Sequence, residues 1–321
     1  MLKPSYSLSM GSASVDPDSS TDLISLRVDM SMNGPAGCFE AVLRSSGGLS
    51  VSRGDTITAS LGYDDQENVF TGVVDVVDAG FHTLRVFGLN SIAKMMRRRA
   101  NTFYESQTCG AIVTDMAGTA EVSTGDIDDG LTLPYYTVDS DATFHEHTMK
   151  LARRCGFDVF ANSDDELVFK AYESSSATTF EYGKDVIQVS RLDQEPVYKG
   201  AKVFGESPSS SQGDDSVHWL TKSPVQGESG SDNELIVQDV SLRDTDSAGS
   251  AAEAVQARFA KSIALVLDVV GTATVKLNDT VETSEMPDSS INGEYQVTRV
   301  EHFLSKSKGF TTSFRLLGSS E

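Results

Sequence analysis

The stretch LPYYTVDSDATFHEHTMKLARRCGFDVFANSDDELVFKAY, from Leu133 to Tyr172, has the clearest structural pattern in this chain of 321 residues. A Pro-Tyr-Tyr strand at 133–138 precedes a helix that Asp139, Ser140 or Asp141 can cap. The helix places four side chains on one stripe, namely Phe144, Thr148, Leu151 and Cys155. Gly156 is suited to end it, and segments 157–160 and 166–170 then predict a hairpin. The stretch therefore predicts a compact α/β module.

The segments on both sides of this module are rich in short strands. Ahead of it we expect strands at 23–30, 56–61, 69–77 and 82–87, which favour a small antiparallel barrel or sandwich. A helix capped by Ser106 or Thr108 follows, with Gly118 suited to its C′ position. Its apolar face contains Cys109, Ile112, Val113 and Met116.

The C-terminal part returns to strands, which we expect at 186–192, 197–204, 273–277, 294–303 and 310–317. Between them, 206–233 is rich in Ser, Gly and Asp and predicts a long mobile loop, in which Trp219 is interpreted as an anchor or partner contact. Residues 247–264 have the composition of a helix. The predicted domains are 1–92, 93–180 and 181–321.

The chain is strongly acidic. It has 47 Asp and Glu against 26 Lys and Arg, so its net charge is −21. Such a surface disfavours binding to nucleic acid through phosphate contacts. An acid excess spread along the chain is typical of proteins from halophiles, although an ordinary acidic protein is the alternative.

The cysteines and apolar runs exclude several classes of protein. Cys38, Cys109 and Cys155 are odd in number and form no CxxC motif, which argues against a disulfide framework or a thiolate zinc site. The N-terminus lacks the apolar core of a secretory signal, and the longest apolar run, 263–270, is interrupted by Asp268. We expect a soluble protein made in the cytoplasm, with no membrane insertion of its own.

Candidate sites for chemistry are weak. His145 and His147 are two residues apart, which places the rings on different sides of a helix, so exposed helix residues are the simpler interpretation than zinc ligands. The Asp-rich loop 126–130 lacks the glycine and glutamate positions of an EF-hand, but an irregular cation site stays open. Arg53-Gly54-Asp55 predicts a turn, and Asp164-Asp165 a solvated hairpin tip.

No nucleophile elbow, phosphate loop or dinucleotide motif is present. The sequence therefore predicts no catalytic residue, no metal and no cofactor. The one basic run in the acidic chain consists of Arg97, Arg98 and Arg99. Because like-charged subunits gain from cations at their contacts, these arginines, with Trp219, are candidate intersubunit contacts. The alternatives for the run are contact with passing nucleic acid, a solvated helix face or local salt bridges.

Several motifs together resemble one family. The segments 293–302 and 309–314 resemble the C-terminal strand pair of the phage late-control D family, which includes the baseplate hub and the hub-like region of type VI secretion spike proteins. Three further segments are similar to that family: 54–57 with 70–74, 88–94, and 151–157. At His147-Thr148 the family's aromatic-Leu pair is absent.

The resemblance implies two tube-forming β-barrels around an α/β insertion, assembled as a homotrimer that matches a hexameric tube to a trimeric tip. It implies a structural tail or baseplate hub in a virion tail or contractile injection particle, from a haloarchaeal virus if the halophile interpretation holds. The implied partners are the tail tube protein, a separate tip or spike protein and the tape-measure protein, with DNA passing through the lumen without specific binding. A cell-envelope hydrolase or a receptor-binding tip protein are the alternatives.

Overall fold

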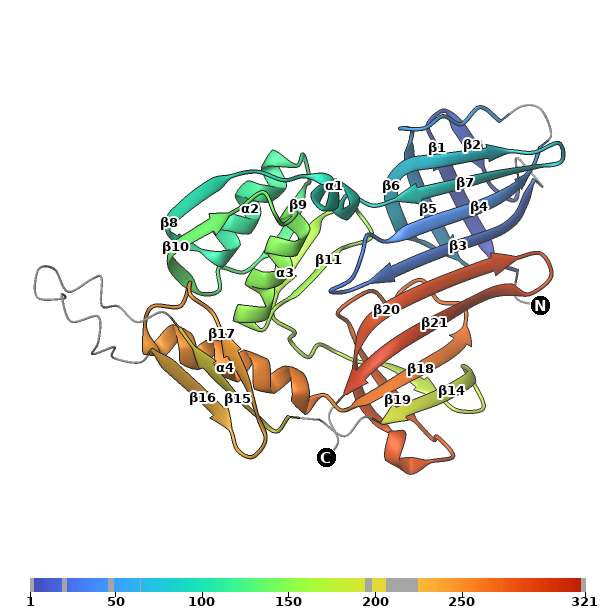
Figure 1. Ribbon diagram of the computed structural model, residues 1–321. Coiled ribbons are helices and arrows are strands. Elements are labelled where there is room, and N and C mark those ends of the chain that lie inside the picture. Colours follow the sequence, from blue (N-terminus) through green and yellow to red (C-terminus); the bar gives the residue numbers. More distant parts are fainter. Residues whose placement is uncertain are drawn as a thin grey trace, which may run out of the picture.

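The computed structural model describes residues 3–18, 22–45, 49–63, 65–193, 198–205 and 225–318. Figure 1 shows a long, curved set of strands beside a smaller module that contains most of the helices. The protein is mainly β, as the sequence predicts. Among the helices of the described ranges, none combines the length and apolarity that a membrane crossing needs.

The first β module is formed by antiparallel strands from the N-terminal part of the chain. These are β1 (Ser5–Met10), β2 (Ala13–Val15), β3 (Leu23–Ser31), β4 (Cys38–Arg44), β5 (Thr56–Gly62), β6 (Gln66–Ala79) and β7 (Thr83–Leu89). Buried and half-buried side chains alternate along β4, because successive side chains of a strand point to opposite faces. In the core, the rings of Phe39 and Phe70 stack 5.6 Å apart. The four strands predicted here are confirmed.

The second β module contains strands from the C-terminal part of the chain. They are β13 (Thr178–Glu181), β14 (Val186–Asp193), β18 (Ile263–Val270), β19 (Thr280–Ser284), β20 (Gly293–Ser305) and β21 (Gly309–Gly318), with the short helix η3 (Ser289–Ile291). Its core includes Leu267 and Phe314, both fully buried. The strand predicted at 273–277 is wrong: Ala273 and Val275 are buried alternately as in a strand, but this segment joins no ladder.

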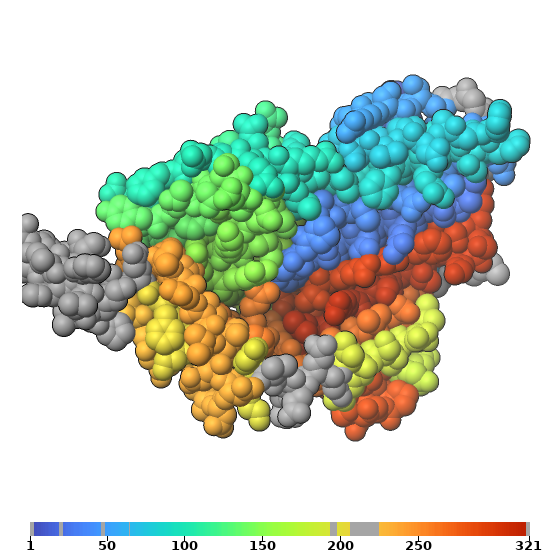
Figure 2. All heavy atoms as spheres, viewed as in Figure 1, coloured from blue at the N-terminus to red at the C-terminus, as the bar shows by residue number. Residues whose placement is uncertain are grey.

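The two β modules share one sheet, since β3 pairs antiparallel with β20 from Arg299↔Ser31 to Ser305↔Ser25. The sheet has 13 strands, with the main order β14-β18-β21-β20-β3-β4-β7-β6-β5-β1-β2. Figure 2 shows the N-terminal and C-terminal strands lying side by side over this junction. No closed barrel is present among the described strands, so the predicted pair of barrels is not confirmed. The first part of β20 pairs with β19 of its own module, and its second part pairs with β3 of the other.

The α/β module lies beside the junction of the two β modules (Figure 1). It contains α1 (Ile92–Arg97), β8 (Thr102–Thr108), α2 (Cys109–Thr119), β9 (Thr124–Ile127), β10 (Thr132–Val138), α3 (Phe144–Cys155), β11 (Asp158–Ala161) and β12 (Leu167–Lys170). The strand predicted at 133–138 and the hairpin after the helix are confirmed. The predicted α/β pattern of this stretch is thus present.

The helix ends differ in part from the prediction. Thr108 caps α2 by accepting a hydrogen bond from the Ala111 N–H, but Gly118 lies inside the helix. The caps predicted for α3 are wrong, because Thr143 is the N-cap and forms a reciprocal capping box with Glu146. Gly156 ends α3 in the left-handed conformation, with φ of 71°, as predicted.

A further helix and three strands pack against the α/β module rather than joining the long sheet. They are β15 (Gly200–Phe204), β16 (Gln226–Gly230), β17 (Glu234–Gln238) and α4 (Thr245–Ala260). Ala251 and Ala252 of α4 share a core with α2 and α3. The backbones of α4 and β16 lie in close contact. A Cβ at Gly227 of β16 would lie 2.2 Å from the Ala248 carbonyl oxygen of α4, so only glycine fits there.

In this region two elements have other bounds than the sequence predicts. The helix predicted at 247–264 ends at Ala260, because Ile263 begins the alternating strand β18. Part of the predicted loop 206–233 is the strand β16, and 206–224 lie outside the described residues. The domain boundaries at 92/93 and 180/181 stay a prediction.

Candidate assembly surfaces

The long sheet ends in an exposed, apolar edge at β14. β14 pairs with β18 on one side, and on its other side the described residues provide only a single bridge from Val186 to Tyr182. Ile187 is 57% exposed and Leu192 is 51% exposed. On the neighbouring β18, Val266 also remains exposed. Unpaired backbone groups beside exposed aliphatic side chains form a template on which another strand can pair.

A hollow of about 330 Å³ lies on the outer face of this end of the sheet. Leu192 and Val266 form its apolar side, and Arg299 and Glu301 of β20 form its charged side. Arg299 donates three charge-assisted hydrogen bonds, from Nε to Asp29 at 2.7 Å, from Nη2 to Asp29 at 2.5 Å and from Nη2 to Glu301 at 3.3 Å. The apolar edge therefore adjoins the paired charges of Arg299 and Glu301, beside Arg191 and Arg315.

The basic run is split by the structure into residues with different partners. Arg97 lies 3.4 Å from Asp75, and Arg53, from the predicted turn, lies 3.3 Å from the same carboxylate. Two arginines that are distant in sequence thus share one acid. The exposed Arg98 side chain has no ion pair or hydrogen bond within the described residues.

Arg99 is also engaged within the chain. Its Nη1 donates to the carbonyl oxygens of Ser140, at 3.0 Å, and Asp141, at 2.5 Å. These bonds fix the loop ahead of α3 to the residues after α1. Trp219 lies outside the described residues. Of the four candidate contacts, Arg98 is the arginine that remains available to another subunit.

A polar network joins all three modules at their meeting point. Asp158 at the start of β11 accepts a 2.6 Å hydrogen bond from Asn33 of the first β module. Its other carboxylate oxygen accepts a 2.8 Å bond from Gln296 of β20. Asn33 also accepts from the backbone N–H of Val159. A single carboxylate therefore helps to fix the α/β module against both halves of the long sheet.

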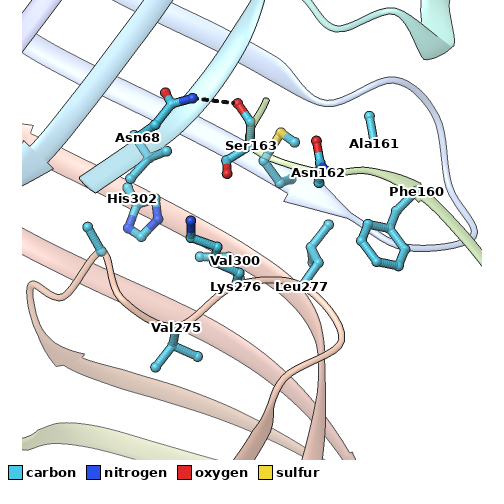
Figure 3. A pocket seen from close by; sticks show the side chains of 13 residues that line it. Asn68, Phe160, Ala161, Asn162, Ser163, Val275, Lys276, Leu277, Val300 and His302 are labelled. Carbon is cyan, nitrogen blue, oxygen red and sulfur yellow. Dashed lines mark hydrogen bonds between the residues drawn. The ribbon is translucent and has the colours of Figure 1, made fainter. Parts of the chain in front are cut away.

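A small cavity of about 50 Å³ lies between the β11–β12 hairpin, β20 and the segment 273–277 (Figure 3). The tip of the β11–β12 hairpin closes one side, where Asn68 donates to the Ser163 carbonyl at 3.0 Å and to Asp164 at 2.8 Å. Asp165 accepts a 2.7 Å bond from the Ser91 N–H, and burial raises the pKa of Asp165. The prediction of a solvated hairpin tip holds for Asp164, which is exposed, and is wrong for Asp165, which is partly buried at a contact between modules.

His302 of β20 lines the same cavity and is 3% exposed. Its Nδ1 lies 3.1 Å from the Thr312 hydroxyl. Burial away from water lowers the pKa of His302 to about 3. The ring is therefore neutral at physiological pH, and it is part of the packed junction.

The two histidines of α3 point to different neighbours. The Nδ1 of His147 lies 2.9 Å from the Tyr136 hydroxyl inside the α/β module. His145 instead lies near the Gly34 backbone of the first β module, and its buried Nδ1 has no hydrogen-bond partner among the described residues. Burial lowers the pKa of both rings. The interpretation as exposed helix residues is wrong for His147, which is buried, and His145 is half-buried.

The buried polar pair His147-Thr148 replaces the apolar pair expected from the family, and both residues find internal partners. The Thr148 hydroxyl donates to the Phe144 carbonyl at 2.9 Å. Since both side chains are hydrogen-bonded, their burial leaves these polar groups satisfied.

The acidic loop after β9 directs its carboxylates apart. Asp126 pairs with Lys170 at 2.9 Å, and Asp128 accepts from the Ala171 N–H at 3.2 Å. Asp129 accepts from the Thr108 hydroxyl beside α2. Among the described ranges, no group of three or more His, Cys, Asp or Glu side chains is arranged to hold a metal ion.

Cys109 and Cys155 meet between α2 and α3. Cys109 is fully buried and Cys155 half-buried, and the interaction between the two thiols raises the pKa of Cys109 and lowers that of Cys155. The Leu131 N–H also donates to the Cys155 sulfur at 3.5 Å. The sequence did not predict this contact, because the two cysteines lie on separate helices.

Sequence reasoning missed the apolar edge and the network around Asp158. A signal for the edge is present at 186–192, where apolar residues occur on both alternating sets and cannot all face one core. No local pattern identifies Asp158 or Asn33, since their contact joins distant parts of the chain.

The chain is similar in structure to several known proteins. No family model matches the chain, and no curated protein matches it by sequence. The 43 kDa tail protein of prophage MuSo2 from Shewanella oneidensis is 14% identical with a TM-score of 0.75, and the match covers 98% of both chains. A tail protein from Neisseria meningitidis is 12% identical with a TM-score of 0.75, over 98% of this chain and 96% of that one.

A component of the type VI secretion system of E. coli, described as structurally similar to bacteriophage tail proteins, is also related in structure. It is 10% identical with a TM-score of 0.61, over 98% of this chain and 77% of that one. The chain therefore has the fold of phage tail proteins and of type VI secretion spike components. The resemblance seen in the sequence is confirmed at the level of the fold.

Proposed function

We propose that this protein is the structural hub of a virion tail or a related injection particle. The observation that carries the proposal is the structural match to two tail proteins along nearly the whole of both chains. Three copies, each with two β modules, would form a ring of six modules. Such a ring joins a hexameric tail tube to a trimeric tip and continues the channel for DNA or cargo.

The edge of β14 and the charged groups near α1 support this arrangement. The exposed Ile187 and Leu192 offer an apolar strand edge to a neighbouring subunit. The free Arg98 offers a cation to an acidic copy of the chain. The partners in this proposal are a second and third copy, the tail tube protein, a tip or spike protein and the tape-measure protein.

The role we propose is structural and not enzymatic. A hydrolase needs converging acids, a nucleophile or a metal, whereas the acidic loop side chains diverge and the two α3 histidines face different parts of the molecule. Purified protein should not cleave peptidoglycan, glycans or peptides. Turnover that is lost on substitution of His145 or His147 would overturn this part.

Imaging of the intact particle tests the proposed function. Density for this chain should occupy the junction of tube and tip, in three copies. A single copy per tail, or a position on a peripheral fibre, would contradict the hub and favour a receptor-binding role.

We also propose a halophilic source, because 21 excess negative charges per chain repel one another at low ionic strength. Assembly and the melting temperature should rise together from millimolar to molar salt. Calorimetry with light scattering measures both. A flat or falling melting temperature with unchanged mass would exclude this source and the control of assembly by charge.

A further inference from the structure

A groove of about 640 Å³ lies between α3 and the strand β17, away from the long sheet. Its apolar lining comes from Val203, Val237, Leu242 and Val255. Lys150, Arg153 and Arg154 line it from α3. The groove thus combines an apolar floor with a basic wall.

The free edge of β17 forms the opposite side. β17 lies at the end of the sheet β16-β15-β17, paired with β15 alone among the described strands. The Asp239 N–H donates to the Phe204 carbonyl of β15, at 2.8 Å. Because backbone groups alternate in direction along a strand, those of Ile236 and Gln238 point away from β15. Ile236 is 68% exposed, so the edge is open and apolar.

The basic wall has more positive than negative side chains. Nε and Nη2 of Arg154 bond Asp239, but its buried Nη1 has no hydrogen-bond partner in the described part of the chain. Lys150 and Arg153 are exposed, and neither has an ion pair among the described residues. The groove therefore has three cations against the single carboxylate of Asp239, in a chain whose net charge is −21.

We propose that this groove binds an extended, acidic segment of a partner protein, which adds as a strand to the free edge of β17. The backbone of the segment would pair with Ile236 and Gln238. Aliphatic side chains at alternate positions would cover the apolar floor, and acidic side chains would meet Lys150 and Arg153. This site does not depend on the proposed trimer, since it lies outside the long sheet.

Peptide display on the intact protein tests the proposal. A random peptide library with segments of about eight to ten residues, the length of a strand, is selected for binding to the wild-type protein in low salt. The expected consensus alternates Asp or Glu with Val, Ile or Leu. A chosen peptide is then measured by fluorescence anisotropy against variants of the groove.

Two variants separate the edge from the wall. Gln238→Pro removes an N–H that points outward, so it blocks strand addition while sparing the ladder to β15. The double variant Lys150→Glu with Arg153→Glu reverses the wall on an exposed helix face. Each should weaken binding about tenfold or more, whereas Lys308→Glu on the distant β20–β21 hairpin should leave binding unchanged. A circular dichroism melt of each variant checks the fold, and the double variant keeps the test decisive if Gln238→Pro unfolds.

Three results would overturn the proposal. They are a selection without enrichment, a consensus of basic peptides, and acidic peptides that bind the double variant as well as they bind the wild type. A fourth is self-association of the wild type that the double variant abolishes, since that would assign the groove to a second copy.

Discussion

The two edge strands of the long sheet, β2 and β14, differ in length and in the side chains that they expose. At one end β2 has 3 residues, and Asp16, Pro17 and Asp18 follow it directly. At the other end β14 has 8 residues, and Ile187 and Leu192 are exposed. Short strands, prolines and charges are the usual means by which proteins prevent edge pairing. The first end has all three, and the second end lacks the shortness and has aliphatic side chains.

This difference indicates that pairing is prevented at β2 and permitted at β14. The same chain therefore contains its own control, because both edges belong to one sheet and experience the same solvent. If the sheet is an assembly surface, substitutions at β14 should change association, and equivalent substitutions at β2 should not.

The largest effect is expected from Ile187→Asp combined with Leu192→Asp. Loss of two apolar contacts and the addition of two charges should weaken self-association at least about 100-fold, since each buried aliphatic side chain contributes about 1.5–3 kcal/mol. Folding of the single chain should change by less than about 1 kcal/mol, because both side chains are half exposed. Sedimentation equilibrium and urea melts measure the two quantities.

Serine at both positions serves as a milder control, and it should give an intermediate loss of association. Unchanged association of the Asp variant would remove β14 from the interface. A large loss of folding stability would mean that these side chains are needed by the monomer.

The second largest effect is expected at His302, which lies where β20 pairs with β3 and joins the two β modules. Its folded pKa of about 3 is below that of an unfolded histidine. The unfolded chain therefore takes up a proton first as pH falls, and stability present at neutral pH is lost below about pH 6.5. Near pH 5 this loss amounts to about 2 kcal/mol from His302 alone.

Urea melts of wild type and His302→Gln between neutral pH and about pH 5 check this slope. The variant should be less stable at neutral pH but should lose less stability on acidification. Parallel curves for the two proteins would contradict a neutral, buried His302.

The sequence predicted those structural features that depend on local patterns of residues. Thr108, Gly156 and the hairpin 157–170 are governed by nearby residues, and their capping and turn preferences were sufficient. The pairing of β3 with β20 was not predictable, because it joins residues more than 250 positions apart through backbone hydrogen bonds that any sequence can form.

The candidate site was predictable to a smaller extent. The Arg97–Arg99 run was identified, but its division into paired and free residues depends on Asp75 and on the carbonyls of Ser140 and Asp141. The network around Asp158 gives no periodic signal, since it consists of single polar residues from three modules.

A smaller effect is expected from Arg97→Ala. The Arg97 side chain is 61% exposed and shares Asp75 with Arg53, so its removal should cost at most about 0.5 kcal/mol of folding stability. Arg98→Ala should leave folding unchanged and weaken association only a few-fold, as a cation at a subunit contact would. Thermal melts and sedimentation at two salt concentrations distinguish these outcomes. Equal effects of both variants on association would contradict the division of the run.

The smallest effect is expected from Ser14→Asp, at the exposed position of β2. Neither folding nor association should change by more than about 0.5 kcal/mol, because this edge is already protected. The same sedimentation experiment is the readout. A loss of association comparable with that at β14 would show that both edges take part, and the comparison between them would fail.

The mass of the intact protein in molar salt tests the central claim most directly. Sedimentation equilibrium over a wide range of concentration should show a species of three chains, each of 34.4 kDa, for the wild type and for Ser14→Asp. The Ile187→Asp, Leu192→Asp variant should sediment as one chain. A wild type that remains a single chain at every concentration would contradict the account.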